Sequence, residues 1–172
     1  LVFAVSVQAQ HVNAPSKLSA VSKSENDNRD YRYLTLSNNL RVLLISDPAA
    51  EKSAAALNVH VGSHQDPKER PGLAHFLEHM VFKGTPNLKI GEFEHLIEKR
   101  GAETNAATSQ DYTHYYITTA PQDFAELAPL QLDVVLNPSL EDEAFEREKL
   151  VVLEEVRRSE HSPSRRTFAR TM

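Results

Sequence analysis

The sequence predicts an α+β fold, in which helices pack on one face of a mostly antiparallel sheet. Short alternating or apolar runs follow one another with turn residues between them, which is typical of strands joined in hairpins. Longer segments between and after these runs carry apolar residues at three-and-four spacing, which is typical of helices. No internal repeat is visible.

The globular part is expected to begin near Tyr31, and the turn at Ser37-Asn38-Asn39 is expected to join its first two strands. The runs predicted as strands cover residues 31–36, 40–45, 54–61, 103–108 and 112–119. Helices are predicted over about 71–83, 90–100, 121–136 and 140–160. Gly84 and Gly101 would end the first two helices, Pro121 would open the third, and Asn137-Pro138 would separate it from the fourth.

The first predicted helix contains His75-Phe76-Leu77-Glu78-His79. Two histidines four apart lie one helical turn apart and can share a metal ion, while Glu78 falls on the same side and can take a proton from a metal-bound water. This H-x-x-E-H order inverts the commoner H-E-x-x-H order. Zinc suits such a site, because catalytic zinc has about three protein ligands and one open position. The alternative is a pair of ordinary surface histidines.

The last predicted helix can supply the third ligand. Glu148 and Glu155 are seven positions apart, so they lie on one helical face, whereas Glu154 points elsewhere. Most carboxylates on so charged a helix are simply solvated, and that alternative stays open for each glutamate alone. No competing nucleophile is apparent, since the chain has no Cys and no G-x-S-x-G sequence. His60 and His64 lie where a strand enters a turn, and the remaining histidines, His11, His95, His114 and His161, have no partner at a useful spacing.

The chain resembles the pitrilysin and insulinase zinc peptidases, a family that includes mitochondrial processing peptidase. The resemblance covers most of residues 31–172 and rests on several landmarks in the right order. They are Gly62-Ser63, Gly72 to Met80, Phe82-Lys83-Gly84-Thr85, Gly101 to Ala106, Thr108, Tyr115-Tyr116, and Phe145 to Glu148 leading into Glu154-Glu155.

The resemblance implies a role for each carboxylate. In this family the distal glutamate ligand follows the second histidine by about 76 positions, and Glu155 follows His79 by 76. The resemblance therefore implies zinc held by His75, His79 and Glu155, with Glu78 as the general base. It makes Glu148 a carboxylate that supports the ligands from behind. The function expected is hydrolysis of peptides or unfolded protein segments by a zinc endopeptidase. A non-catalytic partner or scaffold subunit of the same fold is the alternative.

The resemblance also implies a substrate site and a partner. Asn105, Ala106 and Thr108 occupy a strand to which substrate adds as an extra strand in the family, a mode that relies on main-chain hydrogen bonds. For Asn105 a purely structural turn role is the alternative. Family members place a second, similar half opposite the zinc half, in the same chain or in a partner. Without it the present chain is expected to be poorly active.

Composition and the two ends bound the remaining possibilities. A net charge of −5 and a pI near 5.9 provide no basic stripe, which argues against nucleic acid as a partner. Residues 1–9 are apolar but too short to span a membrane, and they look like the remnant of a secretory signal peptide cleaved before Gln10, with a buried strand as the alternative. Residues 10–30 are expected to be a mobile leader, and 31–172 an incomplete amino-terminal zinc-peptidase domain, because 164–172 enters a helix without a cap. An exported location, the bacterial periplasm, is expected.

Overall fold

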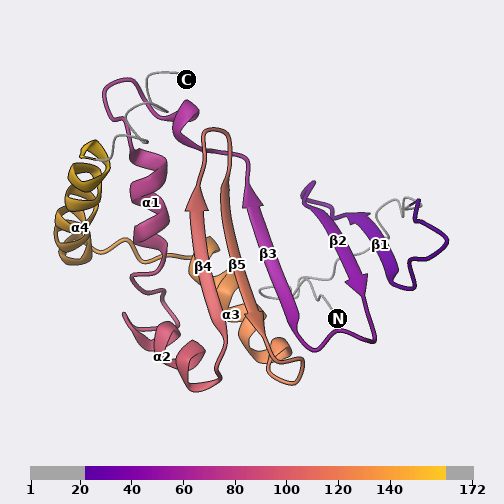
Figure 1. Ribbon diagram of the computed structural model, residues 1–172. Coiled ribbons are helices and arrows are strands. Elements are labelled where there is room, and N and C mark those ends of the chain that lie inside the picture. Colours follow the sequence, from indigo (N-terminus) through magenta and orange to yellow (C-terminus); the bar gives the residue numbers. More distant parts are fainter. Residues whose placement is uncertain (1–21, 162–172) are drawn as a thin grey trace. The chain divides into compact units, whose positions relative to one another are not determined.

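Antiparallel strands and helices make up the computed structural model, which describes residues 22–161 (Figure 1). β1 (Asp30–Thr35) pairs antiparallel with β2 (Arg41–Ser46), from Asp30 opposite Ser46 to Thr35 opposite Arg41. The Leu36 N–H donates to the Leu40 carbonyl at 2.8 Å, and Asn39 takes a φ of 66°, which asparagine tolerates in turns. The predicted α+β class and this first hairpin are therefore confirmed. The expectations for residues 1–21 and 164–172 lie outside the described residues.

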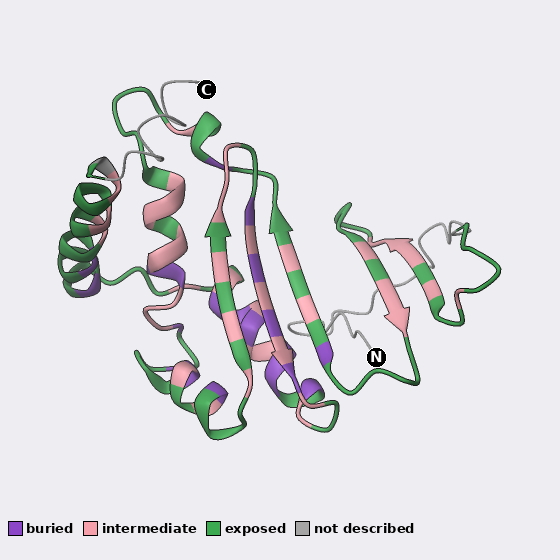
Figure 2. Ribbon diagram, in the orientation of Figure 1, coloured by how far each residue is buried: buried purple, intermediate pink, exposed green. Residues whose placement is uncertain are grey.

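A second sheet contains the remaining strands of the described chain, in the order β3-β5-β4. These are β3 (Ser53–Val59), β4 (Glu103–Thr108) and β5 (Thr113–Thr119), and neighbouring arrows run in opposite directions (Figure 1). β5 is central, and every second residue of it is buried, as the alternating colours of Figure 2 show. β4 lies at one edge of this sheet, where only one side has a strand neighbour among the described residues.

The helices begin and end close to the predicted positions, with two corrections. They are η1 (Ser63–Gln65), α1 (Leu73–Val81), α2 (Glu92–Lys99), α3 (Phe124–Leu136) and α4 (Asp142–Glu160). The helix predicted from Pro121 begins only at Phe124, because a turn closed by the Asp123 N–H on the Ala120 carbonyl precedes it. The helix predicted from Leu140 begins at Asp142, because Leu140 takes a left-handed φ of 50° that a helix does not allow.

The start of α1 is fixed by a residue outside the helix. The Asp66 carboxylate accepts hydrogen bonds from the N–H groups of Gly72 and Ala74, at 2.7 and 2.9 Å. These N–H groups have no partner within the helix, so an acidic side chain both satisfies them and matches the positive end of the helix dipole. Gly72 takes a φ of 91°, which a residue with a Cβ rarely adopts. The turn that positions the histidine helix thus depends on Asp66 and Gly72.

Gly62 allows the loop before α1 to lie directly on the β4–β5 turn. A Cβ added at Gly62 would come within 2.4 Å of the Ser109 carbonyl oxygen, which is closer than real contacts allow. The close approach lets the N–H groups of Ser63 and His64 donate to the carbonyls of Ser109 and Gln110, at 3.0 and 2.8 Å. Glycine is therefore required at this position by packing rather than by its φ angle.

The chain forms two compact units, and the residues of the proposed metal centre fall within one of them. That unit contains 58–93, 106–114 and 134–161, and the other contains 22–57, 94–105 and 115–133. In the site-bearing unit the most buried apolar side chains are Met80, Val81, Phe93 and Val134, and in the other they are Ile117, Phe124, Leu127 and Ala128. None of the helices within residues 22–161 is both long and apolar enough to span a membrane.

Candidate metal centre

Helix α1 brings His75 and His79 together as the sequence predicts. Their rings meet edge to face with centroids 4.8 Å apart, and the two Nε2 atoms are 3.3 Å apart. Both histidine side chains are partly buried, and Met80 and Val81 at the end of the same helix are buried in the core. Two nitrogen donors therefore converge on one point at the surface of the helix.

Glu155 adds an oxygen donor from α4. Its Oε2 lies 3.6 Å from the Nε2 of His75 and 3.6 Å from the Nε2 of His79. Tetrahedral zinc with ligand bonds of about 2.1 Å separates its ligand atoms by about 3.4 Å, so the three observed separations fit such a centre. Within residues 22–161, His75, His79 and Glu155 are the one group of at least three potential donors that could hold a metal ion.

The position of Glu155 depends on the packing of α4 against α1. Phe76 of α1 and Phe145 of α4 meet edge to face, with ring centroids 4.9 Å apart. Aromatic pairs at this separation and angle attract one another beyond the apolar area that they bury. Phe145 lies ten residues before Glu155 on the same helix, so this contact fixes where the carboxylate is presented. The neighbouring Glu154 points away and lies 3.8 and 3.6 Å from Arg157 and Arg158.

Glu148, one heptad before Glu155, holds His79 from behind. Its Oε1 lies 2.9 Å from the Nδ1 of His79, and its side chain is only 8% exposed. An ionised carboxylate accepts and cannot donate, so Nδ1 of His79 is the donor in this contact, and in the neutral imidazole Nε2 then keeps its lone pair. The Nε2 atom of His79 faces His75 and Glu155. A histidine that binds metal through Nε2 needs the tautomer with its proton on Nδ1.

Lys83 completes this chain of contacts, and the sequence analysis did not single it out for a role. Its Nζ lies 2.8 Å from the Oε2 of Glu148. Burial alone raises the pKa of Glu148, but the hydrogen bonds and charges of Lys83 and His79 outweigh it and bring that pKa below its ordinary value. Glu148 is therefore ionised at neutral pH. The sequence shows a basic residue four positions after His79, but this spacing does not identify Glu148 as its partner.

Glu78 projects from α1 and is not one of the three converging donors. Its Oε2 accepts a hydrogen bond from the Oγ1 of Thr108, the last residue of β4. Both side chains are partly buried. The Glu78 carboxylate is thus held by a residue of β4 and lies outside the donor group.

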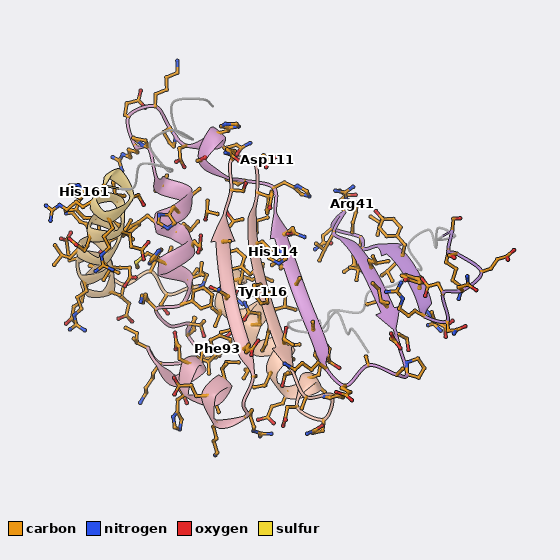
Figure 3. All side chains as sticks on the ribbon, in the orientation of Figure 1. Arg41, Phe93, Asp111, His114, Tyr116 and His161 are labelled. Atoms are coloured by element: carbon orange, nitrogen blue, oxygen red, sulfur yellow. The ribbon has the colours of Figure 1, made fainter. Side chains whose placement is uncertain are left out.

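The two other residues of the predicted substrate strand and the histidines outside the donor group remain to be placed. Asn105 and Ala106 lie on β4, an edge strand, three and two positions before Thr108. The other histidines of the described chain do not join the donor group. Among them, His114 lies on β5 with its Nδ1 2.6 Å from the Asn58 Oδ1, and His161 follows the end of α4 (Figure 3).

Comparison with known proteins then places the chain. The family described as "Insulinase (Peptidase family M16)" matches residues 41–171, a range that includes every residue of the candidate centre. The chain belongs to the insulinase family. The resemblance stated from the sequence is therefore confirmed at the level of the family.

Relatives within the insulinase family are much longer than this chain. Insulin-degrading enzyme of Mus musculus is 40% identical over 129 residues, and that of Homo sapiens is 39% identical over 129 residues. Each match covers 74% of this chain and 13% of the relative, so the chain spans about an eighth of their length. Insulin-degrading enzyme-like 1, peroxisomal, of Arabidopsis thaliana is 38% identical over 129 residues.

Solved structures agree with this placement. A crystal structure of pitrilysin matches with a TM-score of 0.77 and 34% identity, covering 83% of this chain and 15% of pitrilysin. A protease from Helicobacter pylori matches with a TM-score of 0.72 and 33% identity, covering 78% of this chain and 32% of the protease. The α+β arrangement is thus that of pitrilysin-like proteins of the insulinase family.

Proposed function

We propose that this chain is the zinc-binding part of a metalloendopeptidase that hydrolyses peptides or unfolded protein segments. The observation that carries the proposal is the convergence of His75, His79 and Glu155, at 3.3, 3.6 and 3.6 Å between donor atoms. Two imidazole nitrogens and one carboxylate oxygen are a donor set suited to zinc, and three protein ligands leave a position for water. Membership of a peptidase family supports the proposal.

Each residue of the proposed site has a separate role in hydrolysis. When bound, zinc lowers the pKa of a water toward about 7 and polarises the scissile carbonyl. Glu78 takes the proton from the attacking water as general base and gives it to the leaving amine as general acid. Glu148 keeps Nδ1 of His79 protonated, so that the Nε2 lone pair stays available. No side chain forms a covalent intermediate with the substrate in this scheme.

The substrate is proposed to add to β4 as an extra strand. β4 is an edge strand of the described sheet and ends at Thr108, whose hydroxyl bonds Glu78. Main-chain pairing along Asn105, Ala106 and Thr108 would lay a peptide beside the base, with little demand on its sequence. This mode suits extended or unfolded segments better than folded proteins.

The active peptidase is proposed to include a second homologous half, in the same chain or in a partner subunit. The length of the relatives supports this, since the chain spans 13% of each insulin-degrading enzyme. We further propose an exported location, the bacterial periplasm, on the strength of the apolar residues 1–9. Separation of periplasmic from cytoplasmic contents, followed by detection of the protein, tests this location.

Metal analysis and peptide cleavage on the natural-length protein test the proposed function. The expected result is about one zinc per active site and hydrolysis of unstructured peptides that chelator abolishes and zinc restores. A protein that binds zinc and cleaves no peptide would favour a non-catalytic subunit of the same fold. A protein that cleaves equally well after its metal is removed would contradict the proposal.

A further inference from the structure

The hydroxyl of Thr108 donates a hydrogen bond to Glu78, the proposed general base. Its Oγ1 donates to the Oε2 of Glu78, joining the end of β4 to the middle of α1. The two residues are thirty positions apart in the sequence, so tertiary packing alone brings them together. From this contact we propose that Thr108 is a positioning residue, which fixes the Glu78 carboxylate for proton transfer. The inference rests on the proposed function, because it takes Glu78 to be the base.

A glutamate on a helix has several rotamers, and only some of them direct its carboxylate toward a bound water. The β-branched side chain of threonine is stiff about χ1, and strand β4 fixes its backbone. A hydrogen bond from this rigid donor to a charged acceptor therefore selects one orientation of the flexible glutamate. It occupies Oε2 and leaves Oε1 for the proton of the water. Proton transfer is sensitive to such placement, since a displacement of about 1 Å can cost about 10²-fold in rate.

The same contact uses the one hydrogen that the Thr108 side chain can donate, so this side chain does not donate to substrate. An O–H group donates one hydrogen bond, and that of Thr108 is given to Glu78. The main-chain groups of Thr108 can still serve an added strand. Removal of the hydroxyl should therefore change turnover and leave substrate binding nearly unchanged.

The test compares Thr108→Val with Thr108→Ser in the natural-length protein. Valine keeps the branched shape and removes the donor, so kcat should fall about tenfold with KM within about twofold. Serine keeps the hydroxyl, so kcat should return to within about threefold of the parent. Zinc affinity, measured by competition with a chelator, should stay within about twofold for both variants, because the Thr108 hydroxyl bonds Glu78, which is not one of the three donors.

Thr104→Val is the matched control, since it makes the same change on the same strand. The Thr104 hydroxyl lies 2.6 Å from the Gln131 Oε1 and 3.1 Å from the Tyr116 carbonyl oxygen, and it does not bond Glu78. Its kcat should therefore stay within about twofold of the parent. If Thr108→Val does not fold, Thr108→Ala removes the same donor and carries the same test.

Several results would overturn the inference. They are an unchanged kcat in Thr108→Val, a rise in KM at constant kcat, a loss of zinc, or an equal fall in kcat for Thr104→Val. Glu78→Gln, assayed in parallel, separates failure of this inference from failure of the proposed function. An inactive Glu78→Gln beside a fully active Thr108→Val would reject the role of Thr108 alone. A fully active Glu78→Gln would reject Glu78 as the base, and the role of Thr108 with it.

Discussion

A glutamate carboxylate lies near each ring nitrogen of His79. This arrangement explains why Glu148 and Glu155, both on α4, have different roles. Glu148 contacts Nδ1 at 2.9 Å, and the carboxylate of Glu155 lies 3.6 Å from Nε2. Glu148 is buried and bound to Lys83, whereas the side chain of Glu155 is 46% exposed. A buried carboxylate with a cation suits a fixed supporting role, and a more exposed one suits an open metal centre.

Glu155→Gln should weaken zinc binding strongly, because it removes the one anionic donor of the group. Glu154→Gln is the matched control on the adjacent position, about 100° around the helix, and should change the affinity little. Glu154 faces Arg157 and Arg158 instead of the histidines. Chelator competition measures both variants. Equal loss of affinity in the two would contradict the assignment of Glu155.

Lys83→Met should lower the free energy of unfolding of the zinc-free protein by about 1–2 kcal/mol, because it leaves the buried Glu148 with one partner fewer. This range of unfolding free energy already allows for solvent screening, since the Lys83 side chain is 31% exposed. Lys83→Arg should recover most of the loss. Lys149→Met, which removes an exposed pair with Glu146, should change the unfolding free energy by less than about 0.5 kcal/mol. Denaturant unfolding of all three variants measures these differences.

At the scale of elements, the centre is built by two helices that meet through Phe76 and Phe145. α1 supplies the histidines and α4 supplies the third donor, so the distance between the helices sets the geometry of the donor group. Phe145 is not one of the three metal donors. It acts on the site by fixing the position of α4.

Phe145→Ala should therefore weaken zinc binding by about tenfold, at the lower end of the range for groups that support metal ligands. Leu150→Ala on the same helix is the control, because Leu150 is 68% exposed and should leave zinc affinity within about twofold. Chelator competition and a thermal unfolding scan on both proteins make the comparison. An unchanged zinc affinity in Phe145→Ala would show that α4 is held by other contacts.

Local patterns predicted most elements of this fold, and tertiary contacts account for the rest. The 3.6-residue period placed His75 and His79 together, and the turn residues Ser37 to Asn39 marked the first hairpin. The prediction that the third helix opens at Pro121 was wrong, because a proline that suits a first helical turn suits a preceding turn equally well. Spacing alone left Glu155 among several solvated carboxylates, and its choice needed the family resemblance. The contacts of Lys83 and Thr108 depend on packing between distant segments, which no local pattern encodes.

At the scale of the whole molecule, the described residues contain every proposed zinc ligand and the proposed base, while the relatives are far longer. The 172-residue chain alone should therefore bind about one zinc and cleave peptides poorly. Groups that stabilise the developing oxyanion would be missing, and loss of one such donor costs about 10²-fold to 10³-fold in turnover. Addition of the second half in trans should restore cleavage. Equal turnover by the 172-residue chain and the natural-length protein would contradict the two-half proposal.

Zinc content and peptide turnover of Glu78→Gln, measured on one preparation of the natural-length protein, test the central claim most directly. Gln keeps the shape of the side chain and its place beside Thr108 but cannot accept the proton of the attacking water. The account predicts full zinc occupancy with turnover lower by about 10²-fold to 10⁴-fold. Loss of zinc would make Glu78 a ligand, and full turnover with zinc retained would remove it from the chemistry. Either result would contradict the mechanism.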